Sequence, residues 1–290
     1  MIIVKLWGGL GNQLFQFAFG YSLSQKYNQD LVFDKDFYSN QKGNMDIRKV
    51  RLSKLNIPNL KLVDRPQCVN FLENRYINHA IRYFPIFNVS INKKTRFIKE
   101  IKRDGSPIVI DPSFDYYLDG YWQSELYFLD YRNELLSMFS YSDFYSDNRL
   151  RLNNEILSNN SVALHIRRGD VLRRNGLKNV RHDLPLDYYY SSIDYIKKRV
   201  ENPVFYIFSD DVSWVKNNIN TNADLFFVEC DDVDSDIADL WSIAQCKHGI
   251  MSASTFSWWG NWLRKEKGIV IAPTGEHFNK SFFPSDWVRI

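Results

Sequence analysis

The sequence has little cysteine, no long apolar run and almost no excess of charge of either sign. Its three cysteines, Cys68, Cys230 and Cys246, form no Cys-x-x-Cys pair and cannot all pair with one another, so a reducing compartment is the simplest interpretation. The formal net charge of +3 is too small to indicate a nucleic-acid partner.

Membrane and export signals are also missing from the sequence. No run reaches the roughly 18 apolar residues that a transmembrane helix needs, so we expect no transmembrane segment. The start of the chain, MIIVKLWGGLGNQ, lacks the cationic beginning and the longer apolar core of a signal peptide. We therefore expect a cytoplasmic protein. What the sequence does have is 44% hydrophobic residues, enough for a sizeable core.

The second half of the chain alternates between short apolar runs and segments of helical periodicity. Expected strands are 161–166, 204–208, 225–228, 250–254 and 269–273, and expected helices are 187–200, 210–219, 235–249 and 256–265. Strict alternation of buried strands with helices predicts a parallel sheet of the doubly wound α/β class.

The first half opens in the same way and then becomes irregular. Expected elements are a strand at 2–7, a helix at 14–27, a strand at 31–33, and a strand followed by a long helix within 117–139, while residues 60–105 show weak periodicity. The polar stretch 140–160 is the expected boundary. We predict two Rossmann-like domains, 1–150 and 151–290, facing across a cleft, with ligands at the carboxyl ends of the strands.

The first motif is GGLGNQ, residues 8–13, which joins a strand to a helix. Gly9 and Gly11 would let the backbone approach a ligand, and the helix N-terminus would offer N–H donors to an anion. The alternative is a structural turn with Asn12 as the helix cap. Asp34 lies where a dinucleotide-binding fold places its ribose-binding acid, although Leu14 occupies the third glycine position.

The second motif is HIRRGD, residues 165–170, at the end of an expected strand. Arginine suits a diphosphate, because its planar fork makes paired hydrogen bonds to phosphate oxygens, so Arg167 and Arg168 predict such a ligand. His165 could contact a base or a ribose, and Asp170 could accept a proton or hold Arg168. A salt-bridged structural loop is the alternative.

The third motif is FSDD, residues 208–211. The carboxylates of Asp210 and Asp211, at the end of a strand, could accept hydrogen bonds from ribose hydroxyls or from a guanine edge. Ser209 and Asp210 are equally good helix caps, and this alternative stays open.

The fourth motif is SASTFSWWGNW, residues 252–262. Ser254 and Thr255 follow one expected strand and precede a helix, where hydroxyl and N–H groups could bind phosphate. Trp258 and Trp259 are expected in the core, with a sugar-lining position as the alternative.

The acidic run DDVDSD, residues 231–236, could suggest a Mg²⁺ site. These acids directly precede an amphipathic helix, where capping and the helix dipole explain them. We therefore expect no metal.

Taken together, the ordered motifs GGLGNQLFQ, GYWQSE, HIRRGD, FSDD and STFSWWGNWL resemble glycosyltransferase family 11, the α-1,2-fucosyltransferases. The resemblance covers essentially the whole chain. It implies a GT-B-like architecture and metal-independent, inverting transfer of L-fucose from GDP-β-L-fucose to the 2-hydroxyl of a terminal β-galactose. The implied partners are GDP-fucose and a galactoside-terminated glycan, either free or lipid-linked, in the cytoplasm or peripheral to the inner membrane.

The resemblance also implies roles for individual residues. Arg167 and Asp170 would be catalytic, as the main diphosphate contact and the proton acceptor. The donor would be bound by Gly11, Asn12, His165, Arg168, Asp210, Asp211, Ser254 and Thr255 in the second-half domain and across the cleft. The basic stretch after Asp170 lacks the tyrosine that is common there in the family, which leaves the acceptor open.

Rival functions rest on fewer residues. An NAD-binding oxidoreductase would use the glycine turn and Asp34 but leaves HIRRGD unexplained. A non-catalytic sugar-binding module would account for the aromatic content but not for two α/β halves. An α-1,6 or a protein O-fucosyltransferase would share the arginine motif.

Overall fold

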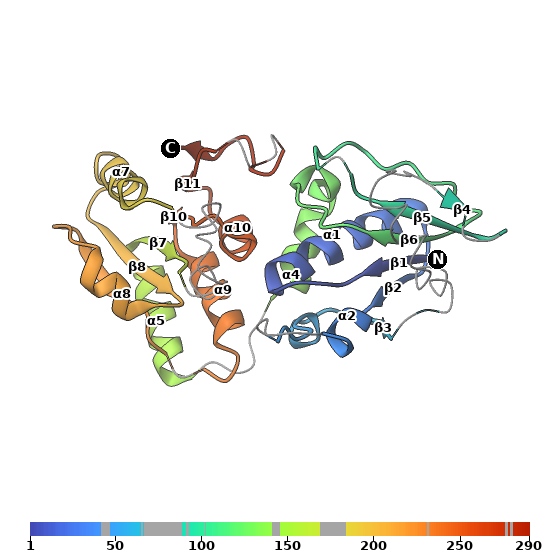
Figure 1. Cartoon of the computed structure of the whole chain (residues 1–290). Helices are drawn as coiled ribbons and strands as arrows, with labels where there is room; N and C mark the ends of the chain where they lie inside the picture. Colours follow the sequence, from blue (N-terminus) through green and yellow to red (C-terminus); the bar gives the residue numbers. More distant parts are fainter. Residues whose placement is uncertain are drawn as a thin grey trace. The chain divides into compact units, whose positions relative to one another are not determined.

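The computed structural model divides the chain into two compact units, each with a sheet of its own. It describes residues 1–41, 47–64, 66, 89–90, 93–101, 103–140, 146–168, 184–230, 232–275, 278 and 281–290. Unit 1 comprises Met1–Phe139 with Asn279–Phe282, and unit 2 comprises Ser140–Phe278 with Phe283–Ile290. The two units are coloured by sequence in Figure 1.

The division lies at the start of the 140–160 stretch, after Phe139. Residue 150 falls inside helix α5 (Asp147–Ser158), which belongs wholly to unit 2. The sequence also gave no sign that the chain returns to unit 1 near its end. There the Ser124 hydroxyl donates to the Ser281 carbonyl at 2.9 Å, and Phe282 packs on Phe15 with ring centroids 6.3 Å apart.

Unit 1 is built on a sheet with the strand order β3-β2-β1-β6-β5-β4, in which β4 pairs antiparallel with β5 and the other described pairs are parallel. Its strands are β1 (Ile2–Lys5), β2 (Leu31–Asp34), β3 (Leu62–Val63), β4 (Val89–Ser90), β5 (Thr95–Lys99) and β6 (Asp115–Asp119). Its helices are α1 (Leu10–Tyr27), α2 (Asp36–Ser39) and α4 (Arg132–Met138), with 3-10 turns η1 (Leu52–Lys54), η3 (Glu125–Tyr127) and η4 (Leu129–Tyr131).

Helix α1 packs closely on the sheet because a glycine faces it. A Cβ atom at Gly20 would lie 2.7 Å from the Val4 side chain, so only glycine allows this approach. Phe17 stacks on Phe33 of β2 with ring centroids 5.2 Å apart. The helix ends at Tyr27, and the left-handed backbone of the following Asn28 (φ 49°) is typical of a helix C-cap. The helix is therefore nearly buried, as its apolar sequence predicts.

The long helix expected within 117–139 is wrong. After β6 the chain forms η3 and η4, and regular helix begins only at Arg132. Phe128 is buried at 1% exposure and has φ −146°, which a helix cannot contain. The expected helix is therefore interrupted at Phe128, and two short 3-10 turns stand in place of its first turns.

Unit 2 has the strand order β12-β11-β10-β7-β8-β9, and its described strand pairs are parallel. Its strands are β7 (Asn160–Ile166), β8 (Pro203–Ser209), β9 (Asp224–Phe227), β10 (His248–Ile250), β11 (Val270–Ala272) and β12 (Val288–Arg289). Its helices are α5, α7 (Leu186–Lys197), α8 (Val212–Asn218), α9 (Ser235–Gln245) and α10 (Thr255–Trp262).

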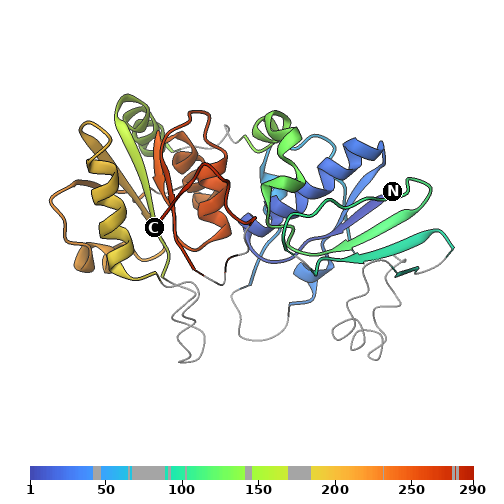
Figure 2. The same ribbon diagram turned by 90° about the horizontal axis from the view of Figure 1, so that it is seen from above.

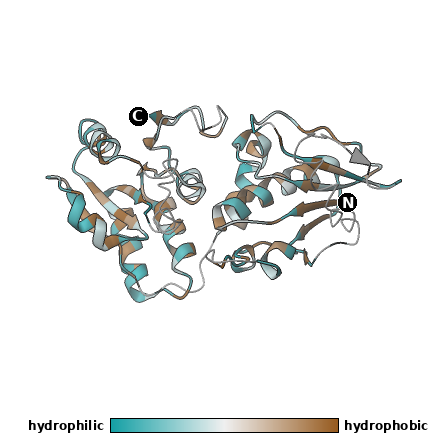
Figure 3. Ribbon diagram, in the orientation of Figure 1, coloured by the Kyte–Doolittle hydropathy of each residue, from teal (hydrophilic) through white to brown (hydrophobic). Residues whose placement is uncertain are grey.

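Helices cover both faces of the unit 2 sheet, as Figure 2 shows. Val162 and Leu164 of β7 pack toward α7 and α8, whereas Ala163 packs toward α5 and α9. Because both faces are covered, the central strands β7 and β8 are mostly apolar and buried, and brown dominates the strands in Figure 3. The expected α/β class, with two Rossmann-like sheets, is confirmed.

One helix of unit 2, α9, ends earlier than predicted. The expected helix 235–249 stops at Gln245, and Gly249 lies in β10 instead of closing a helix. A Cβ atom at Gly249 would collide with the Asn261 side chain of α10. The glycine is therefore needed for close packing of α10 on the sheet.

Candidate functional site

Three neighbouring strands of unit 2 bring together the predicted donor-binding residues of that unit, whereas Gly11 and Asn12 belong to unit 1. β7 lies between β8 and β10, and all three are parallel, so their carboxyl ends meet at one edge. Arg167 and Arg168 follow β7, Asp210 follows β8, and Ser254 lies shortly after β10. We call this edge the arginine edge. Parallel α/β sheets bind ligands at such edges.

Arg167 is directed toward the beginning of helix α10. Its Nη1 donates to Ser254 Oγ at 3.3 Å. Ser254 is the N-cap of α10, and its hydroxyl also accepts the N–H groups of Phe256 and Ser257 at 3.2 and 3.5 Å. Thr255 is the first residue of this helix. A guanidinium and a helix N-terminus thus lie together, and both favour an anion.

His165 lies in β7, two residues before Arg167, and is buried, with 7% exposure. Its Nδ1 is 2.8 Å from Ser252 Oγ, and the Ser252 N–H donates to Ser257 Oγ at 3.1 Å. Burial, and to a lesser extent the Arg167 charge, lowers the pKa of His165 to about 3. The imidazole is therefore neutral at physiological pH and contributes hydrogen bonding rather than charge.

The second arginine takes a different direction. The Arg168 guanidinium lies over the Trp214 ring of α8, 3.7 Å from its centroid, while the Arg168 backbone N–H donates to Asp210 Oδ1 at 2.7 Å. The adjacent arginines thus avoid mutual repulsion by turning to different partners. Binding of the donor by Arg168 stays a prediction.

The helix-cap alternative for the FSDD motif is wrong at the residues it named, Ser209 and Asp210. Asp211, and not Asp210, is the N-cap of α8 and accepts the Trp214 N–H at 3.0 Å. The Ser209 hydroxyl accepts the Asp211 N–H at 3.1 Å. Asp210 contacts the backbone of Arg168, so of the two acids it is better placed for a ligand at the arginine edge.

The glycine turn of unit 1 differs in detail from the sequence interpretation. Gly8 has the left-handed backbone (φ 86°), Gly9 is the N-cap, and Gly11 and Asn12 lie inside the first turn of α1. The alternative of Asn12 as helix cap is therefore wrong. Asn12 instead accepts, through Oδ1, a hydrogen bond from Gln123 Nε2 at 3.0 Å.

Two buried glutamines around this turn, Gln13 and Gln16, were not predicted from the sequence to have a role. Gln16 Oε1 accepts the Trp7 N–H at 3.1 Å, and its Nε2 donates to the carbonyls of Trp7 and Gly120. Gln13 donates to the Gly8 carbonyl and accepts the Arg51 N–H at 2.7 Å. Uncharged amides thus fix the ends of β1 and β6. Their only signal in the sequence is polarity within an otherwise apolar helix.

Asp34 has a structural role in unit 1. It is 3% exposed, and its carboxylate accepts the Tyr117 hydroxyl at 2.7 Å and the Asp36 N–H at 3.0 Å. Both oxygens of this carboxylate accept hydrogen bonds within unit 1. The oxidoreductase interpretation therefore loses the acid that it would use to bind a ribose.

Asp170 lies outside the residues that the structure describes, so its catalytic role stays a prediction.

Among the described residues, no group of three or more His, Cys, Asp or Glu side chains is arranged to hold a metal ion. Asp232 of the acidic run pairs with buried Arg149 at 2.8 Å, and Asp239 pairs with it at 2.6 Å. Asp232 thus serves an ion pair instead of the expected helix cap.

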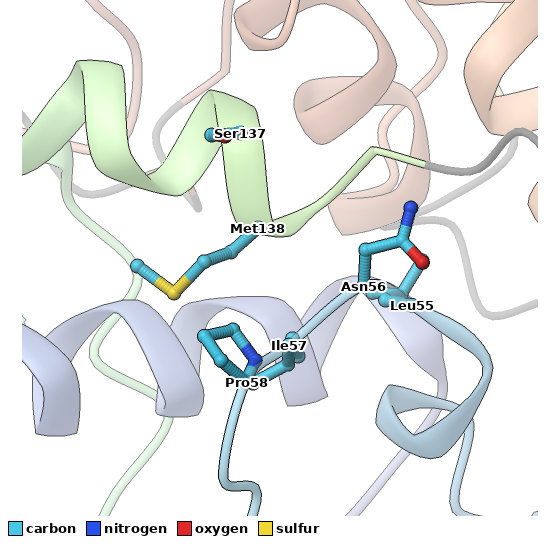
Figure 4. A pocket seen from close by; sticks show the side chains of 6 residues that line it. All are labelled: Leu55, Asn56, Ile57, Pro58, Ser137 and Met138. Atoms are coloured by element: carbon cyan, nitrogen blue, oxygen red, sulfur yellow. The ribbon is translucent and has the colours of Figure 1, made fainter.

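A pocket of about 430 Å³ lies elsewhere in unit 1, as Figure 4 shows. It is lined by Leu55, Asn56, Ile57, Pro58, Ser137 and Met138. None of these residues belongs to the predicted site, and the pocket carries no charged side chain.

In unit 2, Trp258 and Trp259 are fully buried, which confirms their expected place in the core.

The two sheets form a GT-B-like α/β fold. It is similar to the solved structure of a mutant of FUT1 from Arabidopsis thaliana in complex with GDP, with a TM-score of 0.50 at 10% identity, covering 98% of this chain and 74% of that one. Residues 1–290 match the model of Glycosyl transferase family 11, and the protein belongs to this family.

Two relatives extend the comparison. The chain is 34% identical to an alpha-1,2-colitosyltransferase of Escherichia coli, over 100% of this chain and 99% of the relative. It is 33% identical to galactoside alpha-(1,2)-fucosyltransferase 1 of Sus scrofa, over 44% of this chain and 38% of the relative. The protein is therefore a glycosyltransferase.

Proposed function

We propose that the protein transfers L-fucose from GDP-β-L-fucose to the 2-hydroxyl of a terminal β-galactose, with inversion to an α-1,2 linkage. The observation that carries the proposal is the arginine edge, where Arg167 meets the N-terminus of α10. Membership of family 11 and the α-1,2 linkage named for both relatives support it.

The arginine edge suits the chemistry of the leaving group. As the bond from the sugar to GDP breaks, negative charge grows on the diphosphate and the sugar gains positive character. Arg167 would neutralise that charge, and the N–H groups and hydroxyls of Ser254 and Thr255 would bind phosphate oxygens. His165, being neutral, would hold Ser252 in place and contact the nucleoside through hydrogen bonds. No metal is required in this scheme.

The acceptor hydroxyl must lose a proton as it attacks the anomeric carbon, and Asp170 is our candidate acceptor. The competing role is to hold Arg168 and thereby the donor site. For Asp170→Asn, a base role predicts a steep fall in turnover with GDP affinity near wild type. Calorimetric titration with GDP beside turnover tests this, because a large loss of GDP affinity would contradict the base role.

A second donor is favoured by a specific observation, the full-length match to a colitosyltransferase. Colitose differs from L-fucose by lacking the 3-hydroxyl, so both sugars fit the same leaving-group chemistry. Competition between GDP-fucose and GDP-colitose for one β-galactoside acceptor, read as the ratio of the two products, decides between them. A preference for the colitosyl product would overturn the choice of fucose.

The acceptor is proposed as a galactoside-terminated glycan, either free or lipid-linked. Within the described residues, no helix is both long and apolar enough to cross a bilayer. We propose that the enzyme works in the cytoplasm or at the inner face of the membrane. An acceptor screen with GDP-fucose, followed by NMR determination of the new linkage, tests the function. An α-1,6 linkage, or no transfer to any β-galactoside, would contradict it.

A further inference from the structure

The loop that follows β6 in unit 1, residues 120–123, is held by hydrogen bonds to Glu100 and by the buried side chain of Trp122. Glu100 Oε2 accepts the N–H groups of Tyr121 and Trp122 at 2.8 and 2.9 Å. Trp122 has a left-handed backbone (φ 56°), which is rare for a bulky residue. Its side chain is fully buried and stacks on Phe19 with ring centroids 4.0 Å apart. Such strain persists only where surrounding contacts fix it, and it often occurs at functional sites.

This loop brings Gln123 to the first turn of α1. Gln123 Nε2 donates to Asn12 Oδ1 at 3.0 Å, so the Asn12 amide presents its oxygen to Gln123. The opposite end of the amide lies against Gly8, where a Cβ atom would be 2.5 Å from Asn12 Nδ2. Asn12 is thus held on one side by a donor and on the other by a glycine that leaves room for its NH₂ group.

We propose that Gln123 is a positioning residue, which fixes the Asn12 amide so that Asn12 presents an N–H donor to the substrate. The inference rests on the proposed function and on the expectation from the family resemblance that Asn12 binds the donor. With Oδ1 occupied by Gln123, the group of Asn12 that can serve a ligand is Nδ2. An amide N–H binds an oxygen acceptor, such as a hydroxyl of the transferred sugar, which GDP itself lacks, and it cannot remove a proton.

Gln123→Glu tests this orientation by changing a single heavy atom, because the amide nitrogen becomes an oxygen. An ionised carboxylate only accepts hydrogen bonds, so it would attract Asn12 Nδ2 and reverse the amide. We expect kcat at pH 8 to fall by at least about tenfold, as expected for a misplaced substrate contact, with the affinity for GDP little changed. A protonated glutamic acid can donate again, so the ratio of variant to wild-type kcat should rise as the pH falls toward 5.

Gln29→Glu is the matched control. Gln29 Nε2 also donates to oxygen acceptors of unit 1, the carbonyls of Pro112 and Phe114 at 2.7 and 3.2 Å, and it touches neither Asn12 nor the loop. This variant can lose stability but should keep a pH-independent ratio to wild-type kcat. Melting temperatures of both variants, measured at each pH, separate loss of folded protein from loss of catalysis.

Asn12→Asp supplies the second arm of the test. An aspartate still accepts the hydrogen bond from Gln123 but lacks the N–H donor, so we expect kcat to fall as far as in Asn12→Ala. Near-wild-type kcat in Asn12→Asp, or a Gln123→Glu profile that is flat with pH like that of Gln29→Glu, would overturn the inference. Absence of GDP-sugar turnover in the wild type would instead contradict the proposed function.

Discussion

The carboxyl edges of the two sheets are built from different chemistry. At the arginine edge of unit 2, Arg167 and a capped helix N-terminus concentrate positive charge. At the corresponding edge of unit 1, three side-chain amides, Gln13, Gln16 and Gln123, hold the glycine turn and Asn12 through neutral hydrogen bonds.

The difference suggests a division of labour. Charge is expensive to bury and is useful where a leaving group becomes anionic, as expected in unit 2. Neutral amides add no strong field, but they fix geometry, because each has both a donor end and an acceptor end. Unit 1 is therefore suited to orienting groups. Substitutions at the two edges should accordingly differ in size and in the kinetic constant that they change.

The largest effect is expected for Arg167→Ala. Loss of one charged donor to a leaving group typically lowers the rate by about a hundred- to a thousandfold, so kcat should fall by that amount in a GDP-release assay. Arg167→Lys should rescue poorly, because an ammonium group cannot reproduce the forked contact.

Two controls sharpen this result. Arg151→Ala removes an exposed arginine of α5 and should leave kcat unchanged. Arg168→Ala should have a smaller effect than Arg167→Ala, since Arg168 stacks on Trp214. Near-normal turnover of Arg167→Ala, or equal losses at both arginines, would contradict the assignment of the leaving-group contact to Arg167.

A smaller effect is expected from Gly8→Ala in unit 1. Alanine at φ 86° is strained, and its Cβ would displace Asn12 Nδ2. We expect kcat to fall by about ten- to a hundredfold, as for other misplaced substrate contacts, with little change in the affinity for GDP. The control is Gly105→Ala, which also has a left-handed backbone (φ 73°) and whose Cβ would meet Ser124 and Leu126 instead of Asn12. Equal losses in the two variants would mean that strain alone acts.

The two units also differ in how far their sequences reveal them. Buried parallel strands are continuous apolar runs, so most of unit 2 could be predicted, from β7 to β11. In unit 1, β5 (Thr95–Lys99) was missed because it is short and mixed in polarity, within a stretch of weak periodicity. Gly249 was misread because its role depends on Asn261, twelve residues away and on another element.

The site shows the same contrast. The arginine edge could be predicted, because charged residues at the end of an apolar strand stand out and sheet topology then brings them together. The different directions of the Arg167 and Arg168 side chains could not be predicted, since they depend on where Trp214 lies. The link between Gln123 and Asn12 spans 111 positions and has no local pattern.

Acid should weaken unit 2 through His165. Its pKa is about 3 in the folded protein, against 6.5 for an unperturbed histidine, so the unfolded chain binds the proton more readily. Stability is therefore full above pH 6.5 and is lost as the pH falls toward 3. At 1.36 kcal/mol per pH unit, the loss between pH 7.5 and 5 is about 2 kcal/mol.

Urea unfolding across this pH range measures the effect, with His165→Asn as the variant that removes it. His248, whose pKa burial also lowers, gives a comparison at a half-buried position of the same unit, and His248→Asn should flatten the profile less. An unchanged pH profile in His165→Asn would show that other groups cause the acid sensitivity.

The smallest effect, close to none, is expected from removing metal ions. In the proposed reaction, Arg167 and the N-terminus of α10 supply the positive charge that a Mg²⁺ or Mn²⁺ ion would otherwise provide. Asp210 and Asp211 already accept the N–H groups of Arg168 and Trp214. Turnover in excess EDTA should therefore stay within about twofold of its untreated value, since no metal has to bridge the phosphates. If activity is lost and Mn²⁺ or Mg²⁺ restores it, the positive charge at the arginine edge is insufficient. A metal ion then supplies part of the charge that stabilises the leaving group.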